Sequence, residues 1–583
     1  PELLIDILTP ISNGITGIIN AENMFRDTLV SSFTSENFFD DVSGDVTNMN
    51  SMFYSSNFNQ NISGWDVSSV TYMQSMFFNS QFNQSLNTWN VSNVGNMAGM
   101  FSNSPFNQDI GNWNVSSVVD MNAMFSLSPF NQNIGNWDVS SVANMNWMFG
   151  ASNFNQNISA WNVSGVLYMS YMFYDSVFDQ NISAWNVSSV IDMLGMFYSS
   201  NFNKNISNWD VSSVTDMSSM FQSSLFNQNI SEWDVSTVTD MSLMFSSSSF
   251  NQSIANWNVS NVSDMNRMFM SSDFNQDISA WNVSSVENMS FMFTQASDFN
   301  QNLSSWDVSG VTDMEQMFYY SDFNQDIGSW DVSSATSMRG MFRGTPFDQN
   351  LSDWNVSGVT DFTSMFQSSE LSTLNYDSLL TGWASLGSLN YNLSFHGGNS
   401  QYCDGESARN DTLIDVYNWT ITDGGKNCST PEESNYFIFQ INTTASPQNF
   451  SFQVDNSNLT VNWGDGNTTY YNGTVLLTHN YTTAGIYNIS LNGSATRISF
   501  YEGSADLLID ILTPISDGVT GITSAENMFR ETTVVNFTAE DFFDDISRNV
   551  TDMRYMFAWS TFNQDISGWN VSAVTDMFAM FSN

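Results

Sequence analysis

Lysine and arginine are scarce in this 583-residue chain, which has 11 of them against 58 acidic residues and a net charge of −47. Such a negative surface repels phosphate backbones and anionic lipid headgroups, so binding to nucleic acid is not expected. No run of 18 apolar residues is present, and we therefore expect no membrane insertion in this segment. The sequence does not begin with Met, and export cannot be read directly from its first residues.

Histidine and cysteine are equally rare, with two of each. His396 and His479 lie far apart in the sequence, and we find no Gly-rich phosphate loop, metal-spaced Cys/His cluster or nucleophile motif. The expectation is a protein that is not an enzyme and has no catalytic, cofactor or metal site. Cys403 and Cys428 lie in one small region and could pair, which fits an oxidising compartment.

Tryptophan, by contrast, is abundant and periodic. Thirteen tryptophans recur at a step of 24 residues, with one step of 25 before Trp306: Trp65, Trp89, Trp113, Trp137, Trp161, Trp185, Trp209, Trp233, Trp257, Trp281, Trp306, Trp330 and Trp354. A step of this size is typical of a solenoid, in which one coil cannot bury its apolar face alone. We therefore predict a mainly β fold with short helices, built as a parallel solenoid over residues 48–370.

A second period is much longer. The opening Leu3–Arg26 returns, nearly unchanged, as Leu507–Arg530, an offset of 507 − 3 = 504 residues. We expect the chain to be a segment of something longer, whose partners are further copies of its own super-unit, joined covalently or head to tail. Leu3–Ile19 is rich in Leu and Ile and is predicted to cover the first coil, and 1–47 form this cover and the entry coils.

Within a copy, two apolar spacings predict two local structures. The alternation in Ile62–Val67 predicts a short strand with Trp65 and Val67 facing inward. In Val70–Phe77 the apolar residues follow at steps of three, three and one, which predicts a turn or two of helix. The Met of this helix are interpreted as core packing rather than as metal ligands.

An Asn follows the leading Phe of most copies, and Asp179 and Asp348 replace it in two of them. A short side chain with an acceptor satisfies backbone N–H groups in a tight turn. We therefore predict a structural turn ladder at Asn59, Asn83, Asn107, Asn131, Asn155, Asn203, Asn227, Asn251, Asn275, Asn300 and Asn324.

The residue after each Trp is always Asp or Asn, as in Asp66 and Asn90. It could form an Asx turn, carry a glycan, or build a carboxylate column that collects cations. A bulky glycan on every coil does not fit the spacing of stacked strands, so we favour the turn.

Asn-x-Ser/Thr sequons are frequent, and such acceptors matter only in exported chains. One repeat position, that of Asn61, forms such a sequon in several copies but holds Ser85 or Asp109 in others, and this tolerance is expected of an exposed glycosylation site. Further sequons are concentrated outside the repeat, between Asn410 and Asn492. The candidates for N-linked glycans are Asn61, Asn157, Asn181, Asn205, Asn229, Asn302, Asn410, Asn418, Asn442, Asn449, Asn458, Asn467, Asn472, Asn480, Asn488 and Asn492.

The motif W-[DN]-V-S-x-V-x-x-M-x-x-M-F, preceded by F-N-Q, covers Asn48–Ser368 and returns in Asp552–Asn583. It resembles the repeat of BspA-like leucine-rich-repeat surface proteins. The segments NYDSLLTGW, SFHGGNSQYCDGESARNDTL and NWTITDGG, all within Asn375–Gly425, resemble the closing segment of those arrays. The resemblance implies an α+β cap over 371–432 that Cys403 and Cys428 would staple.

Two later segments, VNWGDGN (Val461–Asn467) and HNYTTAGIYNISLNG (His479–Gly493), are similar to polycystic-kidney-disease-type immunoglobulin-like modules. This similarity implies a small β-sandwich over 433–503, after which a second array starts in 504–583. We interpret Asp465 as a turn former rather than a calcium ligand, and calcium binding has no other support.

The resemblances imply a cell-surface or extracellular role in adhesion or structure, without naming a ligand. The copies vary little, so their outer face offers a periodic surface rather than one pocket. We therefore expect a stiff, non-catalytic surface fibre or stalk. The alternative is an adhesin that binds other surface proteins or glycans through the solenoid face.

Overall fold

The computed structural model describes residues 7–9, 11, 17–35, 38–427, 436–444, 447–501, 504–532, 536–537, 549–562, 569 and 571–582. The chain divides into two compact units, Pro1–Asn427 and Cys428–Asn583, and each has its own hydrophobic core. The first unit contains a repeat array and its cap. The second contains a β domain (Tyr436–Tyr501) and the start of a second array.

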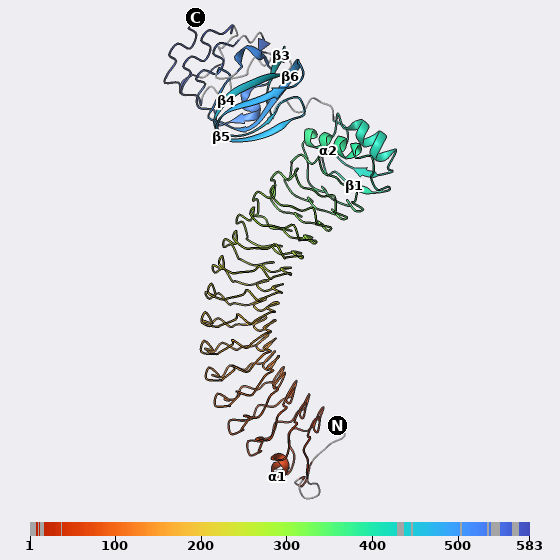
Figure 1. The fold of residues 1–583 in the computed structure, drawn as a ribbon, viewed down its shortest axis with the longest axis vertical. Helices are drawn as coiled ribbons and strands as arrows, with labels where there is room; N and C mark the ends of the chain where they lie inside the picture. The colour runs from red at the N-terminus through yellow and green to blue at the C-terminus, as the bar shows by residue number, and fades with distance from the viewer. Residues whose placement is uncertain are drawn as a thin grey trace. The chain divides into compact units, whose positions relative to one another are not determined.

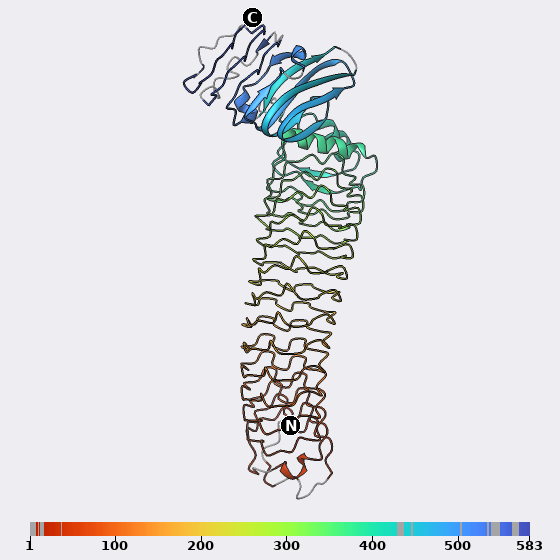
Figure 2. The ribbon, with the colours of Figure 1, turned by 60° about the vertical axis from the view of Figure 1, so that its left-hand side comes forward.

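The first unit is a stack of coils (Figures 1 and 2). Parallel β-bridges join equivalent residues of successive coils from Asn20 to Asp361, and Phe362 then pairs with Phe395 of the cap. The structure therefore has the mainly β, 24-residue solenoid with few helices that the tryptophan spacing predicts.

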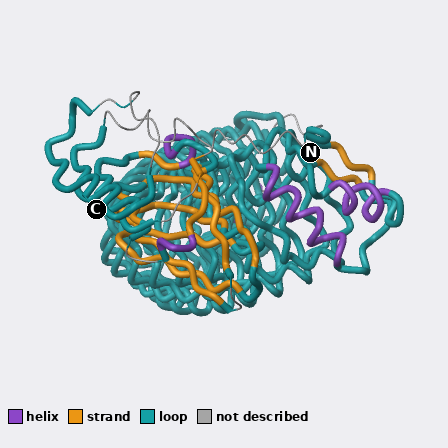
Figure 3. The backbone as a smooth tube through the Cα atoms, turned by 90° about the horizontal axis from the view of Figure 1, so that it is seen from above, coloured by secondary structure: helices purple, strands orange, loops and turns teal. Residues whose placement is uncertain are grey.

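Within each coil, the predicted strand is wrong in its position, and the predicted helix is wrong in its type of structure. Ile62–Val67 forms no strand, and the bridge of that coil lies instead at Tyr72, just before the first Met. Val70–Phe77 forms turns rather than a helix. Figure 3 accordingly draws the coils almost wholly as turns and loops.

Two left-handed residues per coil explain why no helix forms there. Ser75 and Asn79 have φ angles of 55° and 53°, and the same two slots recur along the array. A left-handed residue at every fourth position interrupts a right-handed helix. In addition, the N–H of Ser75 donates to the carbonyl of Ala98 and that of Phe77 to Met100, at 2.7 and 2.9 Å. The N–H groups that a helix would use are therefore bonded to the next coil.

All thirteen repeat tryptophans are buried, as predicted. From Trp89 to Trp354, each indole N–H donates to a backbone carbonyl of the preceding coil, as Trp89 does to Ile62 at 3.1 Å. Because a buried indole N–H needs an acceptor, each tryptophan both fills the core and bonds two coils together.

Ring spacing shows that successive coils are tilted. The centroids of Phe77 and Phe101 are 5.6 Å apart, whereas those of Trp65 and Trp89 are 6.5 Å apart. Each column of equivalent rings has one ring per coil. The column with the shorter spacing between rings therefore lies nearer the inside of a bend. This bend is visible along the array in Figure 1.

The cap covers the last coil. α2 (Thr373–Ser385) starts at Ser372, whose side chain accepts the Asn375 N–H, and it buries Trp383, whose indole bonds the Leu351 carbonyl at 3.1 Å. β1 (Ser394–His396) and β2 (Thr420–Thr422) pair in parallel, and the π-helix η2 (Ala408–Ile414) lies between them in sequence. The only other described helix of this unit is the single turn α1 (Asp40–Ser43).

The β domain is an antiparallel sheet. It contains β3 (Phe437–Thr443), β4 (Gln448–Asn462), β5 (Thr468–Tyr481), β6 (Gly485–Ser494) and β7 (Arg497–Ser499). β4 pairs with β5 along one edge and divides its other edge between β6 and β7. The buried Tyr481 hydroxyl donates to the Trp463 carbonyl at 2.7 Å.

The opening of the second array joins this same sheet. It contains η4 (Ala505–Leu507), β8 (Leu508–Ile511), α3 (Ile515–Gly518), β9 (Val519–Thr520) and β10 (Asn536–Phe537). β8 pairs with β3 and with β10, and β9 pairs with β6. The boundary predicted at 503/504 therefore falls inside one sheet and one core.

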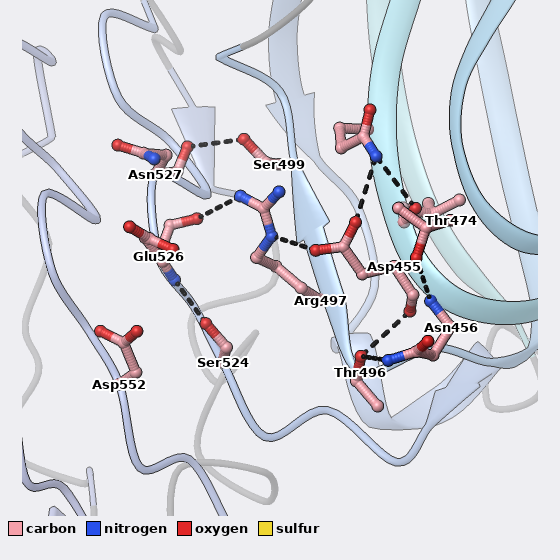
Figure 4. Close-up of polar contacts among 12 residues, drawn as sticks. Asp455, Asn456, Thr474, Thr496, Arg497, Ser499, Ser524, Glu526, Asn527 and Asp552 are labelled. Atoms are coloured by element: carbon pink, nitrogen blue, oxygen red, sulfur yellow. Dashed lines mark hydrogen bonds and ion pairs between the residues drawn. The ribbon is translucent and has the colours of Figure 1, made fainter.

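β7 also acts as the coil that precedes the second array. Arg497 forms a parallel bridge with Ser524, which is bridged in turn to Asp552. The Phe500 ring stacks on Phe529 at 5.7 Å, as coil rings do in the first array. In Figure 4 the Arg497 guanidinium lies between Asp455 of the β domain and Glu526 of the first coil.

Candidate functional site

The two histidines lie in different units of the chain. The Nδ1 of His396 accepts the Gly398 N–H in the cap, while the Nε2 of His479 is 2.7 Å from Asp465 in the β domain. Burial would raise the pKa of Asp465, but hydrogen bonds from His479 and Asn467 outweigh burial and lower it. Among the described residues no three His, Cys, Asp or Glu are placed to hold a metal ion. No helix in the described ranges is long and apolar enough to span a bilayer.

The Asn that follows the leading Phe bonds one coil to the next. Asn59 Oδ1 accepts the backbone N–H of Asn83 at 2.8 Å and the side-chain amide of Gln84 at 3.1 Å. The same pair of bonds recurs up to Asn324. At Asp179 a lysine, Lys204, takes the place of the glutamine at 2.6 Å. These side chains thus form a ladder between coils.

The residue after each tryptophan forms a local Asx turn. Asp66 Oδ1 accepts the Ser68 N–H at 3.0 Å, and Asn90 accepts that of Ser92 at 3.2 Å. Hydrogen bonds from the side chain and N–H of Ser68 lower the pKa of Asp66. Because this side-chain oxygen accepts a backbone N–H, the geometry fits the Asx turn that we favoured over a glycan site or a cation-binding carboxylate column.

The glycan candidates differ in exposure. Those before the tryptophan are exposed, although Asn61 Oδ1 accepts the Ser63 N–H. In the β domain the exposed candidates are Asn449, Asn458, Asn467, Asn472, Asn480, Asn488 and Asn492. Asn410 and Asn442 are half-buried, and the exposed Asn418 donates to Asn392. Most candidate asparagines are therefore accessible for glycosylation, and the presence of glycans on them stays a prediction.

The cap is held by a buried ion pair. Arg409 contacts Asp423 at 2.7 Å, and Tyr376 donates to the same carboxylate at 2.9 Å. Burial and the charge of Asp423 raise the pKa of Tyr376. Cys403 is disulfide-bonded, and Cys428, the other cysteine of the chain, lies outside the described residues.

One surface departs from the repeat. We define the turn face as the residues that run, in each coil, from the bridge residue to the second residue after Phe (Tyr72–Asn79 in one coil). On it, Trp147 lies 4.6 Å from Tyr171 and 5.0 Å from Tyr174, which lies 5.1 Å from Tyr198. All four are half-buried. We call this cluster the aromatic patch.

The aromatic patch is built by three consecutive coils. The Tyr171 ring lies across Gly195, which has a φ angle of 56°, and a Cβ there would be 2.3 Å from the ring. A glycine at this left-handed slot therefore makes room for the ring. Burial, followed by the charges of Asp216 and neighbouring groups, raises the pKa of Tyr171.

A column of carboxylates continues from the aromatic patch. The bridge residues of four successive coils are Asp192, Asp216, Asp240 and Asp264. In Asp216, Oδ1 accepts the N–H and hydroxyl of Ser218 at 2.8 and 2.5 Å. Burial raises the pKa of Asp216, and the charges of Asp240 and Asp192 add to this rise against the Ser218 bonds.

Sequence reasoning did not find this patch. Other coils also have aromatic residues at these slots, as at Tyr54 and Phe291, so the available signal was their run through three consecutive copies. Tyr171 and Tyr174, three residues apart, would share a face of the predicted helix as well, but their contacts with Trp147 and Tyr198 are made between stacked coils.

The stacked coils and terminal cap define a solenoid repeat protein. A family model described as “Mycoplasma protein of unknown function, DUF285” matches residues 19–128, 102–201, 126–224, 174–275, 195–306, 303–391 and 516–583. These matches cover more than half of the chain, and the chain belongs to this family. No curated protein matches it.

Proposed function

We propose that the protein is an extracellular structural repeat protein whose arrays form a stiff fibre or stalk at the cell surface. The observation that carries the proposal is the continuity of the array: one hydrophobic core and one ladder of bridges run from Asn20 to the cap. Bending such a rod separates ring stacks and hydrogen bonds in every coil, which makes the array resist deformation.

The junction between the β domain and the second array supports the same function. A strand of the β domain continues the bridge ladder, and both parts share one core. We propose further that the array is a BspA-like leucine-rich repeat and that the β domain is an immunoglobulin-like module.

Electron microscopy of the native material tests the proposal. Filaments with a regular axial repeat of one super-unit are expected, and isolated particles with widely varying angles between β domain and second array would contradict it. Protease treatment of intact cells tests location, because a surface protein is cleaved while cytosolic controls survive.

A second candidate, an adhesin, is favoured by the aromatic patch alone. Clustered, partly exposed aromatic side chains are typical of protein-binding surfaces. In either role, N-linked glycans would keep the rod soluble. Intact-mass analysis of native protein that returned the bare polypeptide mass would exclude them.

A further inference from the structure

Several arginines of the turn face lie over aromatic rings, whereas Arg339 and Arg554 contact carboxylates. The guanidinium of Arg26 lies 4.0 Å from the ring centroid of Tyr54, and that of Arg267 lies 4.2 Å from Phe291. Arg343 lies 5.6 Å from Tyr319. In each case the arginine and the ring come from adjacent coils.

The second array has the most complete example. Arg530 lies 4.1 Å from Tyr501, 5.2 Å from Tyr555 and 4.8 Å from Trp559. A guanidinium stacked among three rings gains cation–π attraction and loses little hydration, because it is weakly hydrated. The turn face thus repeatedly binds one kind of group, an arginine from the adjacent coil.

The aromatic patch has the rings of such a site but no arginine of its own. The sequence contains no Lys or Arg between Arg26 and Lys204. Lys204 itself belongs to the asparagine ladder, where it contacts Asp179. The rings of Trp147, Tyr171, Tyr174 and Tyr198 therefore have no basic neighbour on their own coils.

The charge beside the patch is of the complementary sign. Asp192 and Asp216 occupy the bridge positions of the next two coils after Tyr168, and the negative charge of Asp216 acts on Tyr171. A cation above the rings would meet these carboxylates, whose attraction adds to that of the ring faces.

We propose that the aromatic patch, with Asp192 and Asp216, binds an arginine side chain from a basic segment of a partner protein. The incoming guanidinium stacks on Tyr171 and Tyr174 as Arg530 stacks on its three rings, and it donates to the carboxylates. This proposal gives the adhesin role a ligand class, whereas the fibre role does not depend on it.

Titration of the full chain with a fluorescent peptide containing two arginines tests the proposal. Fluorescence anisotropy should show saturable binding that weakens with salt, and the same peptide with citrulline in place of arginine should not bind. Tyr171→Ser with Tyr174→Ser should weaken binding about tenfold or more. Serine already occupies these slots at Ser219 and Ser246, so the array tolerates it.

Two further variants complete the test. Asp216→Asn should weaken binding and reduce its salt dependence, and Asn96 shows that a coil accepts Asn at this position. The control, Tyr319→Ser with Tyr320→Ser, removes two rings elsewhere on the turn face, one of them at the slot of Tyr174, and should leave peptide affinity unchanged.

Three results would overturn the proposal: no binding of the arginine peptide, equal binding of the citrulline peptide, or unchanged affinity in the Tyr171/Tyr174 variant. Binding of a neutral oligosaccharide without the peptide would identify a sugar-binding surface instead. Failure here leaves filaments in the microscope unaffected, so it is distinguishable from failure of the proposed fibre.

Discussion

The chain contains nearly the same opening sequence twice, in two surroundings. In the first array Ile7, Ile11 and Ile18 are only half-buried against the core. In the second array their counterparts Ile511, Ile515 and Ile522 are 0, 0 and 2% exposed. Since the residue types are the same, the difference must come from what packs against them.

The β domain provides that packing. β8 lies against β3, where Ile511 pairs with Phe439, and the Leu512 N–H donates to the Ile438 carbonyl at 2.8 Å. In the first array Ile7, the counterpart of Ile511, instead accepts the Ser35 N–H with its backbone carbonyl. The same isoleucines thus pack partly buried against a coil core in the first array and fully buried at a domain junction in the second. Their burial depends on the neighbouring strands, not on their own pattern.

The largest effect in this comparison is expected at Ile515. Ile515→Ala deletes a fully buried side chain and should lower local stability by about 2–5 kcal/mol, whereas Ile11→Ala should cost less because Ile11 is partly solvated. Native-state hydrogen exchange resolves the two units separately, with β3 and β6 amides reporting one and Ala21–Asp27 the other.

The exposed Ile19 provides the control for this pair. Ile19→Ala, at a side chain 64% exposed, should change amide protection very little. Equal costs for Ile11→Ala and Ile515→Ala would mean that covering by the β domain has no energetic consequence, and the comparison would lose its basis.

A smaller effect is expected at the ion pair that connects the β domain to the second array. Arg497 contacts Asp455 at 2.6 Å and donates to the Glu526 carbonyl at 3.4 Å. Arg497→Gln removes a charged, half-buried hydrogen bond and should destabilise the junction by about 1.5–3 kcal/mol. Hydrogen exchange at Thr523–Phe529 is the measurement.

An exposed arginine of the first array is the matched control. Arg339, 53% exposed and 4.0 Å from Glu315, should tolerate Arg339→Gln with a cost below about 1 kcal/mol. If both substitutions changed protection equally, the contact between Arg497 and the β domain would be no stronger than a surface ion pair.

Burial was predictable from the sequence. The tryptophan step defines the coil, and apolar residues at fixed slots such as Trp65 and Phe77 must face inward because nothing else can cover them. α2 was predictable as well, since Tyr376, Leu379, Leu380 and Trp383 form one face of a helix.

Backbone conformation was not predictable in the same way. Leu127, Arg267 and Phe291 have φ angles of 56°, 56° and 60°, although such residues rarely adopt left-handed geometry. Hydrogen bonds to the next coil impose it, and these form only in the stack. The aromatic patch was missed for the same reason, because Trp147 and Tyr171 meet only when coils are stacked in this register.

The smallest effect is expected where the two arrays differ by a charge. Arg554 contacts Asp552 at 2.9 Å and Glu526 at 3.2 Å, and its counterpart in the first array is Asn50 (554 − 504). Arg554→Asn makes the second array resemble the first and should lower stability slightly, by less than either change above, since the side chain is partly solvated. The effect should shrink further as salt is raised.

Its dependence on pH gives the sharper test. Burial would raise the pKa of Asp552, but hydrogen bonds and the charge of Arg554 outweigh burial and lower it from 3.8. A carboxyl group with a lowered pKa stabilises the fold above its ordinary pKa, and this contribution is lost as pH falls through the lowered value. The stability difference between the native chain and Arg554→Asn should therefore be constant near neutral pH and diminish below about pH 4. A difference that grew on acidification would show that Arg554 does not stabilise the ionised form of Asp552.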